Sequence, residues 1–399
     1  MTGPVRFDVH KTCASTAARL GTVHTLHGSF ETPAFMPVGT RATVKGLLPG
    51  QVRDTGAEII LNNAFHLMLR PGDEAIRDRG GVHAFMQWDG PILTDSGGYQ
   101  AWSMADINAL SDDGVAFKSI IDGSNILLSP ERAMEVQNNL RPDIIMALDD
   151  CPPSVAGPNE HILNHRPELA QAHEKQVGQD HRHRLTEAVE RTARWMDRCV
   201  AAHARPDEQG LFGIVQGGAV PELRARSAAQ ITQHDLPGYA IGGVAVGETP
   251  EQIASTVAMT TPFLPEDRPR YLMGVGYERD LVAAIRAGVD MFDCVLPTRN
   301  GRNAGAFTRE GKMQLRNARF KADDGPIDAG CDCAACAGGF SRAYLRHLFH
   351  AGEMLGGILL SMHNLRHFQR LMLDIRVAIR DDAWSAFAQA WPTAGLSDS

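Results

Sequence analysis

The sequence lacks the features that mark membrane proteins, exported proteins and disulfide-rich proteins. It contains no apolar run of about 18 residues, the length that a membrane-spanning helix requires, so we expect no membrane association. The segment Met1–Leu20 is polar and lacks the apolar core of a signal peptide, so export is not expected. The seven cysteines are an odd number, which does not suggest a disulfide framework and favours a reducing, cytoplasmic environment.

Overall positive charge and short internal repeats are also missing. The formal net charge is -8, so any contact with a polyanion has to be made by a local basic patch. The remaining composition, 43% hydrophobic and 22% charged, is that of an ordinary globular protein. A chain of 399 residues can bury a large core as one domain or as two.

Three of the cysteines lie within six residues, at Cys331, Cys333 and Cys336. Thiolates with this spacing can converge on one tetrahedral zinc ion, which then needs one more ligand. The downstream candidates, among which spacing does not choose, are His347, His350 and His363. A sphere of three Cys and one His is closed to water, so the pattern favours a structural rather than a catalytic zinc. The alternative is a redox-active or disulfide cluster.

A basic segment precedes the cysteines. Thr298–Lys321 contains one acid, Glu310, and seven basic residues, Arg299, Arg302, Arg309, Lys312, Arg316, Arg319 and Lys321. A local charge of +6 inside an acidic chain is typical of a surface that contacts phosphates. The alternative is a solvated hairpin.

Eight short apolar runs indicate the strands of a parallel sheet that is covered on both faces. They are Pro33–Gly39, Ala57–Asn63, Pro91–Asp95, Asp143–Asp149, Leu211–Gln216, Tyr239–Gly243, Arg270–Gly274 and Val289–Val295. Helices are predicted between most of them, one capped by Ser129, one capped by Thr249, and one over Glu278–Gly288. This alternation predicts an α/β fold, a (β/α)8 TIM barrel.

Polar or glycine residues end nearly every predicted strand. These are Asn63, Asp95, Asp149, Gln216, Gly243, Gly274 and Asp293. The carboxyl ends of parallel barrel strands share one rim, where active sites lie, so we expect these residues to form one site. Two carboxylates beside a glycosidic carbon suit double displacement, in which one attacks carbon and the other handles the proton of the leaving group. For the adjacent pair Asp149 and Asp150, the alternative role is a helix cap.

The chain resembles the tRNA-guanine transglycosylases, also called queuine tRNA-ribosyltransferases, and looks most like the bacterial form. The resemblance runs from about Arg6 to the C-terminal helices and includes the cysteine triplet. Its other motifs are Leu93-Thr-Asp-Ser-Gly-Gly-Tyr-Gln100, Phe212-Gly-Ile-Val-Gln-Gly-Gly218, Ala240-Ile-Gly-Gly-Val-Ala-Val-Gly-Glu248, Phe292-Asp-Cys-Val-Leu-Pro-Thr-Arg299 and Ser361-Met-His-Asn364.

The resemblance implies an exchange of guanine at the anticodon wobble position, in tRNAs with GUN anticodons, for 7-aminomethyl-7-deazaguanine (preQ1). Asp293 aligns with the nucleophile that forms a covalent intermediate at C1′, and Asp95 aligns with the acid/base. The implied base-binding residues are Ser96, Tyr99, Asp149, Cys151, Gln216, Gly243, Val244, Val246, Met273 and Gly274. Among these, Tyr99 and Met273 stack against the base, and Cys151 and Val246 fit the bacterial type of pocket.

The resemblance also selects His363 as the fourth zinc ligand and implies a homodimer with the zinc subdomain near its interface. We expect tRNA contacts from Arg299, Arg302, Arg316, Arg319 and Lys321. The expected domains are a barrel with an N-terminal β segment over 1–300, a basic and zinc-binding subdomain over 301–365, and C-terminal helices over 366–399 that pack on the barrel.

Departures from the family pattern include Asn62, Ala64, Ile120 and Asp150, and none affects the expected catalytic residues. About twenty extra residues lie between Cys151 and Arg191. Their histidines indicate a solvated helix or, less readily, a metal site, and are His161, His165, His173, His181 and His183. Competing functions are the same exchange with queuine or a DNA acceptor, a non-catalytic tRNA-binding subunit, and a zinc hydrolase.

Overall fold

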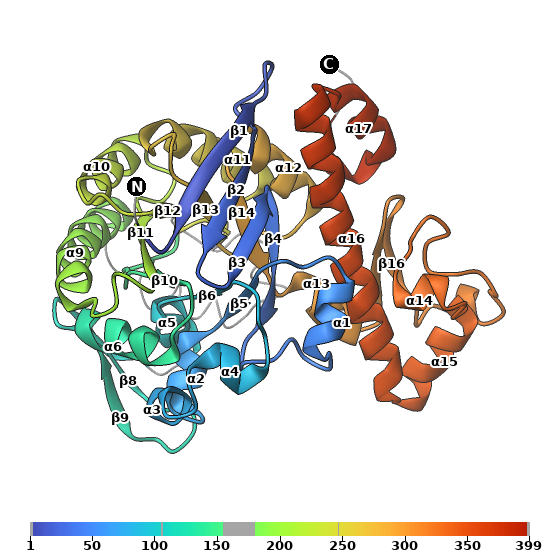
Figure 1. Cartoon of the computed structure of the whole chain (residues 1–399), viewed down its shortest axis with the longest axis horizontal. Helices are drawn as coiled ribbons and strands as arrows, with labels where there is room; N and C mark the ends of the chain where they lie inside the picture. Colours follow the sequence, from blue (N-terminus) through green and yellow to red (C-terminus); the bar gives the residue numbers. More distant parts are fainter. Residues whose placement is uncertain (1–2, 105–106, 155–179, 246, 397–399) are drawn as a thin grey trace.

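The computed structural model describes residues 3–104, 107–154, 180–245 and 247–396, and its centre is a closed barrel of eight parallel strands (Figure 1). Each strand lies within or next to one of the eight predicted apolar runs, so the predicted TIM barrel is confirmed. The strands are β4 (Ala34–Gly39), β5 (Ile60–Asn62), β6 (Ile92–Thr94), β10 (Ile144–Met146), β11 (Gly210–Val215), β12 (Gly238–Ile241), β13 (Arg270–Leu272) and β14 (Met291–Cys294). Pairing of β14 with β4 closes the barrel.

An antiparallel sheet covers the N-terminal end of the barrel. It consists of β1 (Arg6–Thr12), β2 (Arg19–Thr25) and β3 (Gly28–Thr32). Val23 and Phe30 of this sheet are buried in the same apolar cluster as Leu93 and Tyr271 inside the barrel. Within the part of the chain that the structure describes, side chains fill this end, which leaves the opposite rim for a ligand.

Helices surround the barrel, and two of their predicted starts are confirmed. Ser129 caps α6 by accepting a hydrogen bond from the backbone N–H of Arg132, and Thr249 forms a capping box with Gln252 at the start of α11. Among the described residues, the helices before the C-terminal region are α1 (Pro49–Asp54), α2 (Ala64–Leu69), α3 (Asp73–Arg77), α4 (Val82–Met86), α5 (Gly98–Met104), α6 (Pro130–Leu140), α9 (His181–Ala202), α10 (Pro221–Thr232), α11 (Pro250–Thr260), the short η1 (Thr261–Phe263), α12 (Glu278–Arg286) and α13 (Leu296–Arg302).

A second antiparallel sheet, which the sequence reasoning did not predict, lies between β6 and β10 in the chain. Its strands are β7 (Ile107–Ser111), β8 (Gly114–Lys118) and β9 (Asn125–Leu128). Phe117 of β8 is fully buried and packs against Phe65 of α2, so this sheet is joined to the helices beside the rim.

The C-terminal region is organised by α16 (Met354–Asp381), a helix of 28 residues that runs past both the barrel and the cysteine triplet (Figure 1). On the side away from the barrel lie β15 (Gly305–Thr308), β16 (Gly311–Gln314), η2 (Ala318–Phe320), α14 (Ala334–Ala337) and α15 (Arg342–Ala351). The chain ends with α17 (Trp384–Ala390) and η3 (Pro392–Ala394). The expected domain division at residue 365 falls inside α16.

None of the helices among the described residues combines the length and the apolar character needed to cross a membrane.

Candidate active site and metal cluster

The polar strand ends form linked pairs at the C-terminal rim of the barrel. Asn63, after β5, bonds to Asp95, after β6, and Gln216, after β11, bonds to Asp149, after β10. Gly274, after β13, donates its backbone N–H to Asp293 of β14. Each link joins two neighbouring strands, so the polar strand ends lie on one rim as three hydrogen-bonded pairs.

Asp293 is held by two donors on one carboxylate oxygen. Its Oδ1 accepts a 2.6 Å hydrogen bond from the Tyr271 hydroxyl and a 2.9 Å bond from the Gly274 N–H. Burial raises the pKa of the Asp293 carboxyl, and these two bonds oppose that rise because they stabilise the ionised form. The side chain is half-buried. A partly desolvated carboxylate in a fixed orientation suits attack on an electrophilic carbon.

Asp95 lies in a more protected environment. Its Oδ2 accepts a 2.6 Å bond from the Asn63 side chain, and its Oδ1 accepts a 2.8 Å bond from the Ala64 N–H. Burial raises the pKa of Asp95 to about 7, with a further contribution from the nearby charge of Asp293. A carboxyl group that titrates near neutrality can both donate and accept a proton in one catalytic cycle.

Asp149 and Gln216 form the opposite part of the rim. Gln216 is 1% exposed, and its Nε2 donates a 2.6 Å bond to Asp149 Oδ2. Burial raises the pKa of Asp149 to about 7, and the bond from Gln216 opposes the rise. A β-carbon added to Gly243 would lie 2.4 Å from Gln216 Oε1, so only glycine fits against this amide. The three residues form one compact polar wall.

The adjacent Asp150 does not share this wall. Both of its carboxylate oxygens bond to Arg184 of α9, and Arg191 of the same helix adds another contact. It is not a helix cap, since no helix begins there among the described residues. Asp149 and Asp150 therefore serve different purposes, one in the rim and one in an ion-pair network.

The other expected base-binding residues lie near these carboxylates. Ser96 and Val244 are buried, Tyr99 and Met273 are half-buried, and Gly274 is exposed at the rim. Burial raises the pKa of the Cys151 thiol, while hydrogen bonds from Gln216 and the Gly243 backbone oppose the rise, so Cys151 touches the same wall. The glycines after Ser96 are needed for packing, because a β-carbon on Gly97 or Gly98 would crowd Phe65 or Leu148. Val246 lies outside the described residues.

The cysteine triplet and His363 form one cluster, as the resemblance implied. Candidate ligand atoms of Cys331, Cys333, Cys336 and His363 all lie within 4.8 Å of one another. The imidazole Nδ1 of His363 is 3.4 Å from the sulfur atoms of Cys333 and Cys336. Its Nε2 bonds to the Phe307 carbonyl at 2.8 Å, which directs the Nδ1 lone pair at the thiols. Three sulfurs and one such nitrogen suit a tetrahedral ion, whereas His350 contacts the Arg316 carbonyl instead.

A second group of possible ligands lies at the other end of the barrel. His27 and His83 both bond to the buried carboxylate of Asp143, at 2.8 and 3.1 Å. Their rings are stacked with centroids 3.6 Å apart and planes within 13°, so their in-plane nitrogen lone pairs do not converge on a point. This arrangement is a hydrogen-bonded tie between the N-terminal sheet and the barrel. Of the inserted histidines, His161, His165 and His173 lie outside the described residues, and His181 and His183 lie on α9.

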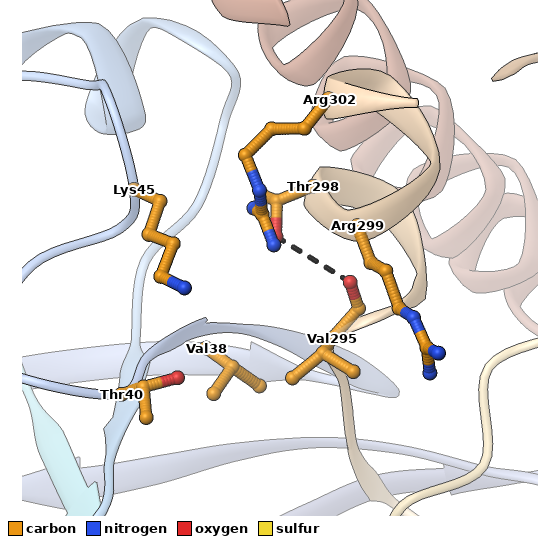
Figure 2. Close-up of a pocket in the computed structure, with 7 residues that line it drawn as sticks. All are labelled: Val38, Thr40, Lys45, Val295, Thr298, Arg299 and Arg302. Atoms are coloured by element: carbon orange, nitrogen blue, oxygen red, sulfur yellow. Dashed lines mark hydrogen bonds between the residues drawn. The ribbon is translucent and has the colours of Figure 1, made fainter. Parts of the chain in front are cut away.

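The basic residues separate into two groups. Arg299 and Arg302 lie on α13, beside a cavity of about 160 Å³ at the ends of β4 and β14. Its lining contains three cations and no carboxylate, and consists of Val38, Thr40, Lys45, Val295, Thr298, Arg299 and Arg302. Figure 2 shows Lys45 and Arg302 approaching from opposite sides. Burial and the neighbouring Arg299 both lower the pKa of Arg302.

The second group lies in the C-terminal region. Arg316, Arg319 and Lys321 are exposed, and the guanidinium groups of the two arginines lie over the rings of Phe349 and Phe320. Arg309 differs, because it bonds to Asp374 and lies over Trp391. The basic segment is therefore only partly free to contact a polyanion.

Sequence reasoning missed Tyr271 as a site residue. The sequence feature that could have identified it is a tyrosine in the middle of a buried strand, where the hydroxyl needs a hydrogen-bond partner. Asn364 was noticed only as part of a motif. Its amide accepts from the Phe307 N–H and donates to the Pro297 and Gly305 carbonyls, so it fixes α13 and β15 beside the cluster of Cys331, Cys333, Cys336 and His363.

Comparison with known proteins agrees with this geometry. The family model described as queuine tRNA-ribosyltransferase matches residues 13–394. A relative named queuine tRNA-ribosyltransferase from Geobacillus kaustophilus is 48% identical over 389 residues, covering 98% of this chain and 96% of its own length. Relatives with the same name from Lysinibacillus sphaericus and Symbiobacterium thermophilum are 48% and 50% identical, over 98% and 97% of this chain and 96% and 90% of theirs. The chain therefore belongs to the queuine tRNA-ribosyltransferase family, the tRNA-guanine transglycosylases.

Proposed function

We propose that this enzyme exchanges guanine at the anticodon wobble position for preQ1 by double displacement through a covalent ribosyl-aspartate. The observation that carries the proposal is the difference between two neighbouring carboxyl groups. Asp293 has one oxygen fixed by Tyr271 and Gly274, whereas Asp95 is enclosed and has a pKa of about 7. One is arranged to attack and the other to transfer a proton.

In the first step, Oδ2 of Asp293 attacks C1′ of the wobble nucleotide. The C1′–N9 bond breaks, its electron pair leaves with guanine, and protonated Asp95 supplies the proton that neutralises the departing base. In the second step, ionised Asp95 takes the N9 proton of the incoming base, N9 attacks C1′, and the ester bond to Asp293 breaks. The two inversions retain the configuration at C1′, and no oxidant or nucleotide triphosphate is needed.

The wall formed by Asp149, Gln216 and Gly243 is the proposed base pocket. It offers carboxylate, amide and backbone groups of the kind that recognise the hydrogen-bonding edge of a base outside its stack. Tyr99 and Met273 would cover the two faces of the base, and Ser96, Cys151, Val244, Val246 and Gly274 complete the set. An anticodon loop is already single-stranded, so moving its base into this pocket requires little unpairing.

The metal of the Cys331, Cys333, Cys336 and His363 cluster is proposed to be one structural zinc ion per chain. All four ligands are protein atoms, so the ion would stabilise the fold and would not activate water. A zinc hydrolase therefore finds no support in this site.

Phosphates of a tRNA with a GUN anticodon are the proposed partners of the basic residues. Arg299 and Arg302 line the cavity at the ends of β4 and β14, and β14 also carries Asp293, so we infer that the backbone adjoining the reacting nucleotide passes here. Arg316, Arg319 and Lys321 would contact a more distant part of the same tRNA. This placement supports one continuous contact from the rim to the C-terminal region.

A homodimer is proposed through an aromatic face that half-buried Phe340 forms with the exposed Tyr344 and His347 of α15. The rings of Phe340, Tyr344 and His347 follow one another, with neighbouring centroids 5.9 and 6.5 Å apart, and Met354 nearby in sequence is 84% exposed. The proposed occupant is a second copy of the chain, in keeping with the family. Sedimentation of Tyr344→Ala at micromolar concentration should give a monomer where the unmodified protein gives a dimer.

A cytoplasmic location is proposed because the seven cysteines form no disulfide and tRNA is the proposed substrate.

The decisive experiment measures labelled guanine entering purified tRNA, followed by its release on addition of preQ1. We expect incorporation into tRNA with a GUN anticodon and none into a variant with adenine at the wobble position. Queuine in place of preQ1, and a DNA hairpin in place of tRNA, test the alternative substrates. A protein that binds tRNA tightly without incorporating guanine would instead be a non-catalytic subunit.

A further inference from the structure

Arg224 of α10 is completely buried, and its guanidinium group donates hydrogen bonds to four backbone carbonyl oxygens. Nε bonds to Gly218 at 2.7 Å, and Nη1 bonds to Val215 at 3.0 Å and to Gly242 at 2.8 Å. Nη2 bonds to Gly243 at 3.2 Å. A single side chain thus joins the rim ends of two neighbouring barrel strands, β11 and β12.

The carbonyl groups that Arg224 holds belong to backbone on either side of the proposed base pocket. Val215 and Gly218 flank Gln216, while Gly242 and Gly243 precede Val244. In a trans peptide the C=O and the following N–H point in opposite directions. Because the Gly243 carbonyl is directed at Arg224, the N–H of Val244 is directed away from it. The orientation of this peptide group is therefore set from behind the pocket.

The same helix also fixes Gln216 directly. The hydroxyl of Ser227, three residues after Arg224 and hence on the same helical face, accepts the backbone N–H of Gln216 at 2.9 Å. The side chain of Gln216 then bonds to Asp149. One face of α10 therefore contacts Gly243 and Gln216 directly, and it reaches Asp149 through Gln216.

Packing alone does not explain an arginine at this position. Burying a cation is unfavourable unless its donors are satisfied, and an apolar side chain would fill the same volume without that requirement. Burial lowers the pKa of Arg224 to about 10, and the charge of Glu248 opposes the decrease, so the group remains charged at neutral pH. The planar guanidinium has five N–H donors in a fixed fork, whereas a lysine ammonium has three and cannot span the same four acceptors.

We propose that Arg224 is a positioning residue that fixes the Gly242 and Gly243 peptide groups, so that backbone atoms beside Gln216 recognise the base in a preset orientation. This inference rests on the proposed base pocket. It holds that the Arg224 side chain supports the backbone of that pocket from behind and does not itself touch the base. It follows that Arg224 controls the affinity and discrimination of the base and leaves tRNA affinity unchanged.

The test compares Arg224→Lys with Arg226→Lys, a matched control two residues further along α10. Arg226 is half exposed and pairs with Glu190 on the surface, so it shares the helix but not the contacts with the rim. Each variant is assayed for thermal stability, for KM of guanine and of tRNA, for kcat, and for direct binding of guanine by calorimetry. We expect Arg224→Lys to lose on the order of 10²-fold in kcat/KM for guanine, the loss typical of misplacement by about an ångström. The KM for tRNA should stay within about two-fold of the unmodified enzyme, a change of less than about 0.5 kcal/mol.

Arg224→Ala provides a second measurement, because guanidinium ion can enter the space that the side chain leaves. Addition of guanidinium at concentrations far below denaturation should restore guanine binding to Arg224→Ala, and methylammonium should not. Equal guanine affinity in Arg224→Lys and the unmodified enzyme would overturn the proposal. It would also be overturned by loss of guanine and tRNA affinity in equal proportion, or by failure of both variants to fold, since these results mark a purely structural residue.

Failure of the proposed function gives a different result. If the unmodified enzyme binds no guanine, or if Gln216→Ala binds it normally, then the pocket itself is misassigned. If the unmodified enzyme binds guanine and Gln216→Ala does not, a normal result for Arg224→Lys removes only the positioning role.

Discussion

The hydroxyl of Tyr271 donates a 2.6 Å hydrogen bond to Oδ1 of Asp293 from the neighbouring strand. Burial raises the pKa of Tyr271 well above its ordinary value, so this hydroxyl keeps its proton throughout the working pH range. It therefore always donates, and it stabilises the ionised form of the proposed nucleophile.

Replacing Tyr271 by Phe should shift the acid limb of the pH–rate profile towards higher pH. The bond lowers the pKa of Asp293, so removing it lets the pKa rise, and a larger fraction of Asp293 is protonated and inactive at low pH. The measurement is kcat/KM for guanine exchange across the acid range. Tyr239→Phe is the control, because that hydroxyl bonds to the His234 carbonyl and not to a rim carboxylate. Identical acid limbs for all three proteins would contradict the assignment.

Asp293→Asn should abolish both turnover and the covalent RNA adduct, because an amide cannot act as the carboxylate nucleophile. The adduct is trapped with tRNA and separated on a denaturing gel. Asp95→Asn should behave differently, since the nucleophile remains while the proton donor is lost, and a slow adduct should still form. An adduct in Asp293→Asn would remove this residue from the proposed role.

Asp149→Asn should be more stable than the unmodified enzyme above neutral pH, and its advantage should disappear in acid. The folded-state pKa of Asp149 is about 7 and its ordinary value is 3.8, so the folded protein binds the extra proton between these values. The unmodified enzyme consequently loses stability as pH rises from about 4 to about 7, a loss that asparagine does not incur. Differences in Tm between the two proteins test this across that window.

The control for this prediction has the opposite sign. Lys11 and the Ala14 backbone lower the pKa of Asp382, so Asp382→Asn should lose stability relative to the unmodified enzyme as pH rises. Part of the change of Tm with pH should persist in Asp149→Asn, because the pKa of Asp95 is also about 7. A difference in Tm between Asp149→Asn and the unmodified enzyme that stays constant with pH would be evidence against a protonated Asp149.

Metal analysis should find one zinc ion per chain, and Cys333→Ser should lose both the metal and a large part of its thermal stability. Closed zinc sites contribute directly to folding free energy. Cys199→Ser is the matched control, since Cys199 is equally buried but lies beside the Leu148 backbone, remote from the cluster. A second ion per chain that disappears in His27→Gln would show that the His27, His83 and Asp143 group also binds metal.

Binding of tRNA should depend strongly on salt although the chain is acidic, and Arg316→Ala with Arg319→Ala should flatten that dependence. Each lost phosphate contact lowers the slope of log K against log salt by roughly one unit. Arg309→Ala removes the same charge from the same segment but breaks a pair with Asp374, so its slope should stay unchanged. The idea fails if the double variant keeps the original slope or if guanine affinity falls as far as tRNA affinity.

The barrel could be predicted because its strands are buried on both faces and leave continuous apolar runs in the sequence. The rim could be predicted for a related reason, since parallel strands bring their carboxyl ends together. Spacing did not choose among the histidines near the cysteines, because a helix brings residues from many positions within reach. Only the family resemblance identified His363, and the structure confirms that it completes the cluster.

Other parts of the site were beyond sequence reasoning. Asp149 and Asp150 looked like a pair, yet Gln216 bonds to Asp149 while α9 supplies arginines to Asp150. Tyr271 and Arg224 occupy strand and helix positions that resemble ordinary core or surface, and their roles depend on partners from other segments. Contacts across such distances leave no local pattern in the sequence.

The helix α16 connects two regions that would otherwise be independent. Near its start His363 belongs to the cysteine cluster, while His367 bonds to Glu278 of α12 and Gln369 bonds to the Phe35 carbonyl of β4. Binding of the proposed zinc ion at His363 would therefore stabilise a helix that also packs on the barrel wall. Removal of the proposed zinc ion would then weaken the support that α16 gives to β4 through Gln369. If the cluster holds the proposed zinc ion, metal supply determines how long the active enzyme persists, although no step of the proposed reaction uses the ion.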